Sequence, residues 1–214
     1  MKAQKTLMKK LGTFALVLLV ASLALATSLA LTPRPAAPEE KAPPGVAVGS
    51  VVGDFTLPDA SGREHSLSLL KGAKGTVIIF VATKCPVSNA YNARMAKLAA
   101  DYRAKGINVV GINSNSTEPA AEIKQHAADN GLNFTILKDE GNRVADRLGA
   151  QVTPEAYLLD ASGKLVYRGR IDNSRNGDNI TANDLRDAVE AVIAGKPVEK
   201  AEVRAFGCSI KRVS

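Results

Sequence analysis

The sequence has few of the residues that build metal clusters and disulfide-stapled folds. Its 214 residues include two cysteines, two histidines, no tryptophan and 4% aromatic residues. Two cysteines are too few for a disulfide-dense miniature fold, a zinc finger or an iron–sulfur cluster held by four thiolates. Two histidines and few aromatic rings leave little material for a histidine-built metal site or a base-stacking surface. With 45% hydrophobic residues, the chain can still build a packed core.

The sequence also lacks a basic stripe within its presumptive folded part. Four of its 28 basic residues lie in the first ten positions, and no acidic residue precedes Glu39. Without residues 1–26, the balance is 24 basic against 21 acidic residues. Nucleic-acid binding needs basic charge gathered on a folded face. We therefore expect no nucleic-acid partner.

An export signal is predicted over residues 1–31. Ten residues with four lysines precede an uncharged run from Leu11 to Leu31, which contains the A-x-A cleavage pattern at Ala24–Ala26. If the run is not cut, it is long enough to anchor the chain in a bilayer. A core helix is the other alternative. We expect an exported protein, periplasmic or anchored to the membrane facing outside the cytoplasm, where disulfides persist. The membrane is a partner only through this segment.

A proline-rich linker is predicted over residues 32–46. Five of the ten prolines of the chain lie in this stretch, together with alanine and charged residues. Such a composition favours extended, semi-rigid geometry. The linker would place the following domain at a distance from the signal or anchor.

Residues 47–196 are predicted to form one α/β domain. Residues 76–81 form a continuous β-branched apolar run, typical of a strand buried on both faces, and residues 107–112 are the next predicted strand. Apolar residues at positions 87, 91, 95, 98 and 102 form one helical stripe between them. The other expected elements are a hairpin over 54–67, a helix over 118–130, a strand over 134–137, a short helix over 142–148, a hairpin over 156–168 and a helix from about 181 to 194. This order predicts a mixed sheet with a parallel centre and an antiparallel edge.

Cys85 lies where the first buried strand meets the following helix. Unpaired N–H groups and the dipole at a helix N-terminus favour a thiolate, and Lys84 adds a neighbouring positive charge. Pro86 fits the first position of the helix. A thiolate is the nucleophile in disulfide exchange and in peroxide reduction. We interpret Cys85 as reactive, against the alternative of a buried and inert cysteine.

The sequence resembles the thioredoxin-like superfamily, and within it the redoxins of the alkyl hydroperoxide reductase/thiol-specific antioxidant family. Two features over roughly residues 50–195 carry the resemblance: the segment FVATKCPVS after a buried strand, and Val152-Thr153-Pro154 close before the strand AYLLD. The resemblance implies a thioredoxin-like fold, a central mixed sheet flanked by helices, with an N-terminal β-hairpin extension. It also implies that Pro154 follows a cis peptide bond and faces Cys85, and that the backbone at Thr153 pairs with the bound substrate chain.

The sequence departs from both familiar patterns of this superfamily. Ser88 stands where thiol–disulfide oxidoreductases carry the second cysteine of C-x-x-C, so Cys85 has no adjacent partner. Thr83 lies two residues before Cys85, whereas typical peroxiredoxins have a threonine three residues before the cysteine. Their site also needs an arginine. Arg94 should point away, being half a helical turn out of phase with Cys85, which leaves Arg170 and Arg175 as candidates.

Cys208 lies in a C-terminal tail predicted over residues 197–214. The ending around it, Gly207 to Lys211, resembles that of a thioredoxin-like branch, and a C-terminal cysteine that resolves the reaction of an earlier one is known in peroxiredoxins. Pairing of two cysteines is the default expectation in an exported protein. The alternatives are a structural disulfide and a cysteine that is unpaired or pairs between molecules.

The leading prediction is an exported thiol-dependent oxidoreductase in which Cys85 attacks and Cys208 resolves. Its partners would be a thiol reductant or a protein disulfide, and no cofactor is expected. The first alternative is a peroxidase that acts on peroxides with the same two cysteines. The second is a non-catalytic module that binds copper through Cys85, Cys208 and a histidine. Both histidines are otherwise interpreted as surface residues: His65 as exposed and His126 on a helix.

Overall fold

The computed structural model describes residues 45–213. The predicted signal or anchor and nearly all of the predicted linker lie outside the described residues. Within residues 45–213, no helix is both long and apolar enough to cross a membrane.

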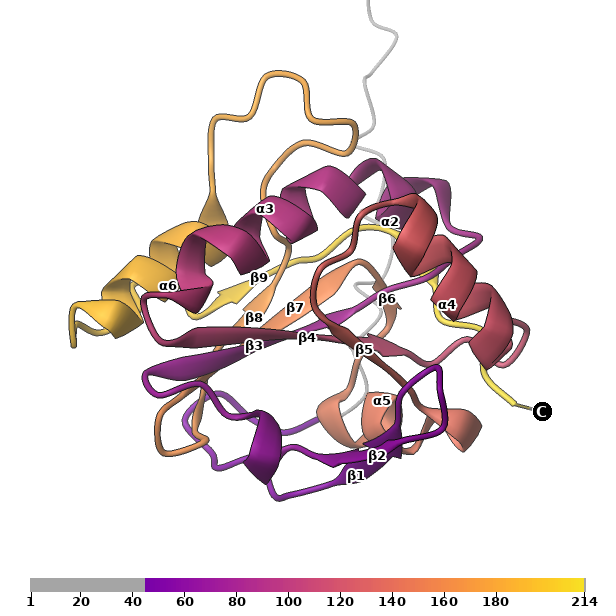
Figure 1. The fold of residues 1–214 in the computed structure, drawn as a ribbon. Coiled ribbons are helices and arrows are strands. Elements are labelled where there is room, and N and C mark those ends of the chain that lie inside the picture. Colours follow the sequence, from indigo (N-terminus) through magenta and orange to yellow (C-terminus); the bar gives the residue numbers. More distant parts are fainter. Residues whose placement is uncertain (1–44, 214) are drawn as a thin grey trace, which may run out of the picture. The chain divides into compact units, whose positions relative to one another are not determined.

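A six-stranded mixed sheet forms the centre of the fold (Figure 1). Its spatial order is β5-β4-β3-β7-β8-β9. The neighbours β3, β4 and β5 run parallel, β7 is antiparallel to both β3 and β8, and β9 runs parallel to β8. The strands are β3 (Gly75–Phe80), β4 (Ile107–Asn113), β5 (Thr135–Lys138), β7 (Glu155–Asp160), β8 (Leu165–Gly169) and β9 (Glu202–Val203). The parallel centre and antiparallel edge confirm the mixed sheet predicted from the sequence.

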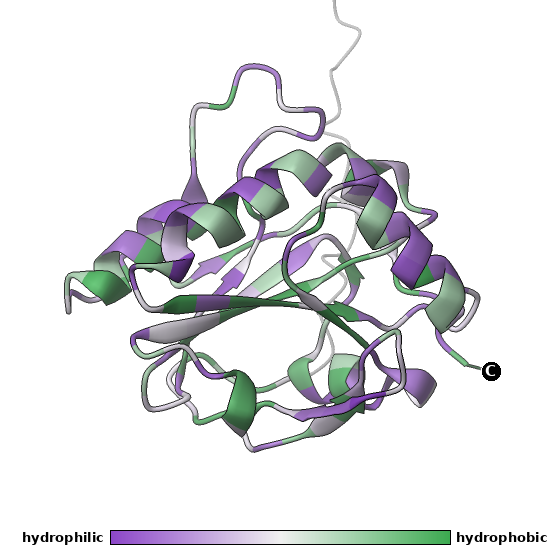
Figure 2. Cartoon of the chain, in the orientation of Figure 1, coloured by the Kyte–Doolittle hydropathy of each residue, from purple (hydrophilic) through white to green (hydrophobic). Residues whose placement is uncertain are grey.

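Helices cover both faces of this sheet, as Figure 1 shows. Val77 and Ile79 of β3 face one layer, whereas Ile78 and Phe80 face the other, because side chains alternate along a strand. The first layer contains α2 (Pro86–Ala90), α3 (Asn92–Arg103), α4 (Ala120–Asp129) and α6 (Asp184–Ile193). The second contains the hairpin of β1 (Thr56–Pro58) and β2 (Glu64–Ser66), the short helices η1 (Ser68–Leu70) and η2 (Glu140–Asn142), and α5 (Arg143–Leu148). The apolar colouring of the strands in Figure 2 follows this double burial.

Three boundaries differ from the sequence prediction. The predicted helix over the stripe is two helices, α2 and α3, because the chain turns at Tyr91, whose N–H bonds Ser88 only three residues back. The helix expected from residue 118 begins at Ala120, since Pro119 is extended and precedes it. The last helix begins at Asp184 instead of near residue 181.

His65 is also placed differently from the prediction. Its side chain is 11% exposed, and Nε2 lies 2.8 Å from Asp59 Oδ2 in the turn of the β1–β2 hairpin. This bond links Asp59, just after β1, to His65 in β2, and it keeps the histidine side chain largely buried.

The C-terminal tail is part of the folded structure. Its strand β9 pairs with β8, and its strand β10 (Cys208–Ser209) pairs antiparallel with β6 (Val152–Thr153). Ile210 is buried in the second layer beside the apolar core. The tail therefore runs from one edge of the sheet to the segment that precedes β7.

Candidate active site

Cys85 caps the N-terminus of α2, immediately after the loop that leaves β3. Its backbone is extended, Pro86 occupies the first helical turn, and the Cys85 sulfur accepts the N–H of Ser88 at 3.3 Å. The residue is 4% exposed. The predicted position at a strand-to-helix junction is confirmed, and it places the sulfur against a backbone N–H donor.

Ser88 and Asn89 brace this loop from within. The Ser88 hydroxyl accepts the N–H of Ala82 at 3.1 Å, and the Asn89 amide donates to the carbonyl of Thr83 at 2.9 Å. Ser88 is fully buried. The residue that replaces a second cysteine therefore closes the loop around Cys85.

Glu118 holds the same loop from outside and was missed by the sequence analysis. Its carboxylate accepts the N–H of Thr83 at 2.8 Å and that of Lys84 at 3.0 Å. The Lys84 ammonium was expected to favour the thiolate, but it pairs with Glu122 at 2.9 Å. Glu122 also accepts the hydroxyl of Thr83. In the sequence, Glu118 and Glu122 both look like ordinary acidic residues at the start of a helix. Only the structure distinguishes them, because it shows that Glu118 is buried.

Thr153 and Pro154 face Cys85, and the peptide bond between them is cis. The Cys85 thiol donates to the Thr153 carbonyl, with 3.3 Å between sulfur and oxygen. The Thr153 hydroxyl is buried and has no hydrogen-bond partner among the described residues. These contacts place the segment predicted to bind substrate directly at the sulfur.

The tail reaches the same point. Cys208 lies opposite Thr153 in the β6–β10 pairing. At Gly207, an added Cβ would lie 2.0 Å from the Thr153 carbonyl oxygen, so a side chain there would collide with the backbone beside the cis bond. Glycine thus permits the close approach that brings Cys208 to Cys85.

The two thiols differ in their acidity. Burial raises the pKa of Cys85, but hydrogen bonds from the Cys208 thiol and the Ser88 N–H outweigh it and lower the pKa. Burial raises the pKa of Cys208, and the neighbouring Cys85 raises it further. Both cysteines are free. Cys85 is thus the first of the pair to ionise, with the Cys208 thiol as a hydrogen-bond donor to it.

The candidate arginines serve other contacts. Arg94 binds Asp172 at 2.6 Å and lies 3.5 Å from the centre of the Tyr91 ring. Arg170 pairs with Asp184 at 2.7 Å. Arg175 lies over the ring of Phe206, two residues before Cys208. Among residues 45–213, no arginine donates a hydrogen bond to the Cys85 sulfur.

Neither histidine joins the two thiols. His65 bonds Asp59, and His126 bonds the amides of Asn92 and Asn130. No three of the described His, Cys, Asp and Glu side chains are placed to hold a metal ion. The expected copper set of Cys85, Cys208 and a histidine is therefore not assembled in the described part of the chain.

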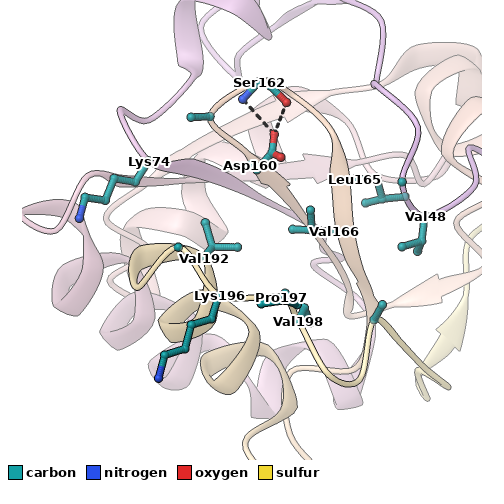
Figure 3. Close-up of a pocket in the computed structure, with 14 residues that line it drawn as sticks. Val48, Lys74, Asp160, Ser162, Leu165, Val166, Val192, Lys196, Pro197 and Val198 are labelled. Carbon is teal, nitrogen blue, oxygen red and sulfur yellow. Dashed lines mark hydrogen bonds between the residues drawn. The ribbon is translucent and has the colours of Figure 1, made fainter.

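A surface hollow lies between the β7–β8 turn and the end of α6 (Figure 3). Its polar groups already have structural partners: Lys74 donates to the Ile193 carbonyl at the end of α6, and Asp160 accepts from Ser162 within its own turn. Neither cysteine lines the hollow. It contributes nothing to the thiol chemistry.

Comparison with known proteins gives the family. The model of the AhpC/TSA family matches residues 48–168. The chain belongs to the AhpC/TSA family. It is a redoxin-type oxidoreductase, as the resemblance implied. Cys85 and the cis-proline segment lie inside the matched region, whereas Cys208 lies beyond it.

The relatives fall into two named groups. Over 120 residues, the chain is 33% identical to thiol-disulfide oxidoreductase ResA of Geobacillus thermodenitrificans, covering 56% of this chain and 67% of the relative. Over 142 residues, it is 32% identical to peroxiredoxin Q of Sedum lineare, covering 62% and 75%. Among solved structures, the hypothetical protein SMc02350 of Sinorhizobium meliloti superimposes with a TM-score of 0.74 at 35% identity, covering 80% of this chain and 97% of that one.

Proposed function

We propose that this redoxin is a thiol–disulfide oxidoreductase in which Cys85 is the nucleophile and Cys208 the resolving cysteine. The observation that carries the proposal is the β6–β10 pairing. It sets Cys208 opposite Thr153, the residue whose carbonyl accepts the Cys85 thiol. The pair replaces C-x-x-C, with the second thiol supplied by the tail.

The chemistry follows from the order in which the thiols ionise. The Cys85 thiolate attacks a substrate disulfide, forms a mixed disulfide and expels one substrate thiolate, which takes up a proton. Cys208 then loses its proton and attacks the Cys85 sulfur. The second substrate thiol leaves, and a Cys85–Cys208 disulfide remains. Two electrons have passed from the dithiol to the substrate, and an external thiol reductant would restore the pair.

Supporting roles are proposed for the neighbouring residues. Thr153 and Pro154 would position the substrate sulfur, since they lie against Cys85. Pro86 and Ser88 would hold the cap geometry, and Thr83 and Lys84 would fix the loop through their N–H groups. This assignment makes the loop a support for one reactive sulfur.

Peroxide reduction is the second candidate. Cys85 is 4% exposed, and β10 already occupies the edge of β6, so a small oxidant meets less obstruction than a protein chain. The thiolate would attack the peroxide oxygen, release an alcohol or water and become a sulfenic acid. Attack by Cys208 would release water and give the same disulfide.

Export is proposed from the sequence of the N-terminal segment. Its basic start, its uncharged run and the A-x-A pattern favour translocation. A fusion of the full chain to alkaline phosphatase tests it: phosphatase activity in intact cells is expected, and its absence would contradict export.

One experiment tests the two-cysteine cycle. Three reduced proteins are compared: the native full chain, Cys85→Ser and Cys208→Ser. Each is treated with a disulfide-linked peptide or one equivalent of hydrogen peroxide, the reaction is quenched, and the intact mass is measured by mass spectrometry. The native chain should form the Cys85–Cys208 disulfide. Cys208→Ser should accumulate a peptide adduct or a sulfenic acid on Cys85, and the reagent that gives the faster reaction identifies the oxidant. If both thiols stay free in the native chain, the cycle is wrong.

A further inference from the structure

A buried polar network lies at the ends of β4 and β5. Asn113, Asn115 and Glu118 are each less than 5% exposed. The Asn113 amide donates to the Glu118 carboxylate at 2.6 Å, and the Asn113 side-chain oxygen accepts the N–H of Asn115 at 3.2 Å. Buried polar groups need such partners, and a fully paired network holds one arrangement.

One end of the network holds the nucleophile loop. Glu118 accepts two consecutive backbone N–H groups, those of Thr83 and Lys84, which immediately precede Cys85. These bonds are charge-assisted and lie in a covered environment, where they are strong. A change at Glu118 therefore acts on the position of the Cys85 backbone.

The other end of the network holds the tail. The N–H of Lys211 donates to the Asn115 side-chain oxygen at 2.7 Å, and the Lys211 carbonyl accepts the N–H of Ser116 at 2.8 Å. Lys211 is three residues beyond Cys208. The tail is thus tied at Asn115 and Ser116, just after the strand that supplies Asn113.

A second buried ion balances the charge of Glu118. Lys138, 6% exposed, donates from Nζ to the Asn115 carbonyl at 2.6 Å, and its ammonium is attracted to Glu118. Burial raises the pKa of Glu118, but the N–H groups of Thr83 and Lys84 and the Asn113 amide outweigh it and lower the pKa, so the carboxylate stays ionised.

We propose that Glu118 and Asn115 are positioning residues that fix the segments of Cys85 and Cys208 relative to each other, so that the two sulfurs react without a rearrangement. The network runs unbroken from the loop at Thr83 and Lys84 to the tail at Lys211. This inference rests on the proposed two-cysteine cycle. It adds that the effective concentration of one thiol at the other is set by residues that touch neither sulfur.

Glutathione equilibration of the full chain tests the inference. The fraction of Cys85–Cys208 disulfide is measured over a series of reduced-to-oxidised glutathione ratios, which gives the effective concentration of the pair. In Glu118→Gln, an NH₂ group replaces one carboxylate oxygen, so one backbone N–H of the loop loses its acceptor. The effective concentration should fall about tenfold, the effect of one charge-assisted hydrogen bond. Asn115→Ala frees the Lys211 N–H, retains Glu118 and should lower it by a similar factor. If Glu118→Gln does not fold, the Asn115→Ala variant alone tests the positioning role.

Asn108→Ala is the matched control. Asn108 lies at the start of β4, the strand that ends at Asn113, and its amide donates to the Leu70 carbonyl at 2.7 Å. Its loss should lower the melting temperature and leave the effective concentration unchanged. If Glu118→Gln and Asn115→Ala also change only the melting temperature, the network has no positioning role. If the native chain forms no intramolecular disulfide at all, the two-cysteine cycle itself fails, and the inference with it.

Discussion

The segments that carry the two cysteines are held in different ways. Around Cys85, the Ser88 N–H, the Ser88 hydroxyl and the Asn89 amide all bond to residues at most six positions away. Around Cys208, the partners are distant in sequence: the tail bonds Gln151, Asn115 and Asp146 at Ile210, Lys211 and Arg212. A short stretch of chain thus builds most of the surroundings of Cys85, whereas the position of Cys208 depends on the whole fold.

This difference indicates which substitutions would displace each cysteine. Local contacts re-form whenever the loop and α2 fold, so the Cys85 cap tolerates changes elsewhere except at Glu118, which holds the loop before it. Contacts between distant residues depend on every element that lies between them. Changes far from Cys208 can therefore separate it from Cys85, whereas the distant contacts of the Cys85 segment are concentrated at Glu118 and Thr153.

The largest expected effect comes from Cys85→Ser. A hydroxyl at this position is a far weaker nucleophile than a thiolate. Turnover of a disulfide peptide and of peroxide should fall to the uncatalysed background, while the melting temperature changes little. Residual turnover at more than a few per cent of the native rate would show that Cys208 or another group can attack alone.

Gly207→Ala tests the tail without removing either thiol. Its Cβ would meet the Thr153 carbonyl oxygen at 2.0 Å, so the tail must move away from the cis peptide. Overpacking of this kind costs about 1–3 kcal/mol. Formation of the Cys85–Cys208 disulfide should slow at least about fivefold for a tail displaced by such an energy. Alkylation of Cys85 should speed up, because the tail no longer covers it. Gly195→Ala is the comparison: nothing lies within 4 Å of its Cβ position, but its φ of +66° strains an alanine, so it should lower stability without slowing disulfide formation.

A cysteine close to Cys85 in sequence can replace Cys208 as the second thiol. Ser88→Cys in the Cys208→Ser background puts a second thiol in the first turn of α2, where the Ser88 N–H already meets the Cys85 sulfur. It should restore part of the disulfide-forming activity that Cys208→Ser loses. The bond between Ala82 N–H and the Ser88 hydroxyl is given up, so stability should fall by about 1 kcal/mol. No recovery would mean that this side chain cannot turn from Ala82 to Cys85.

The smallest expected effect is a shift in the pH dependence of Cys85 alkylation. The Cys208 thiol donates to the Cys85 thiolate and so lowers its pKa. Cys208→Ala removes that donor and keeps the β10 backbone in place, which raises the pKa and moves the alkylation curve to higher pH. The measurement is the rate with iodoacetamide across the thiol range. An unchanged curve would show that the Cys208 thiol does not lower the pKa of Cys85.

Much of the fold could be predicted because its elements are long and periodic. The strand β3 is largely a β-branched apolar run, β4 is rich in Ile and Val, and the stripe beginning at Val87 marks the helical region after Cys85. The break at Tyr91 could not be predicted, since the stripe continues through it. The hydroxyl of that residue bonds Asp172 on a distant segment, a contact without a sequence signal.

The candidate site could be predicted only where it is local. The strand-to-helix junction located Cys85, and the resemblance indicated the segment at Thr153. The two-residue strands β9 and β10 are too short for any periodic pattern, so their pairing could not be foreseen. Glu118 escaped notice because a carboxylate before a helix is usually solvated, and only the folded chain shows that it is buried.

The pairing of β10 with β6 also sets an order of events in biosynthesis. Ribosomes synthesise the chain from its N-terminus, so Cys85 emerges long before the tail that carries Cys208. During that interval the cap can form, and the reactive sulfur has no companion. Foreign thiols and oxidants compete for it until β10 docks. Completion of the tail is thus a maturation step, because only then does Cys85 have Cys208 and the β10 backbone beside it.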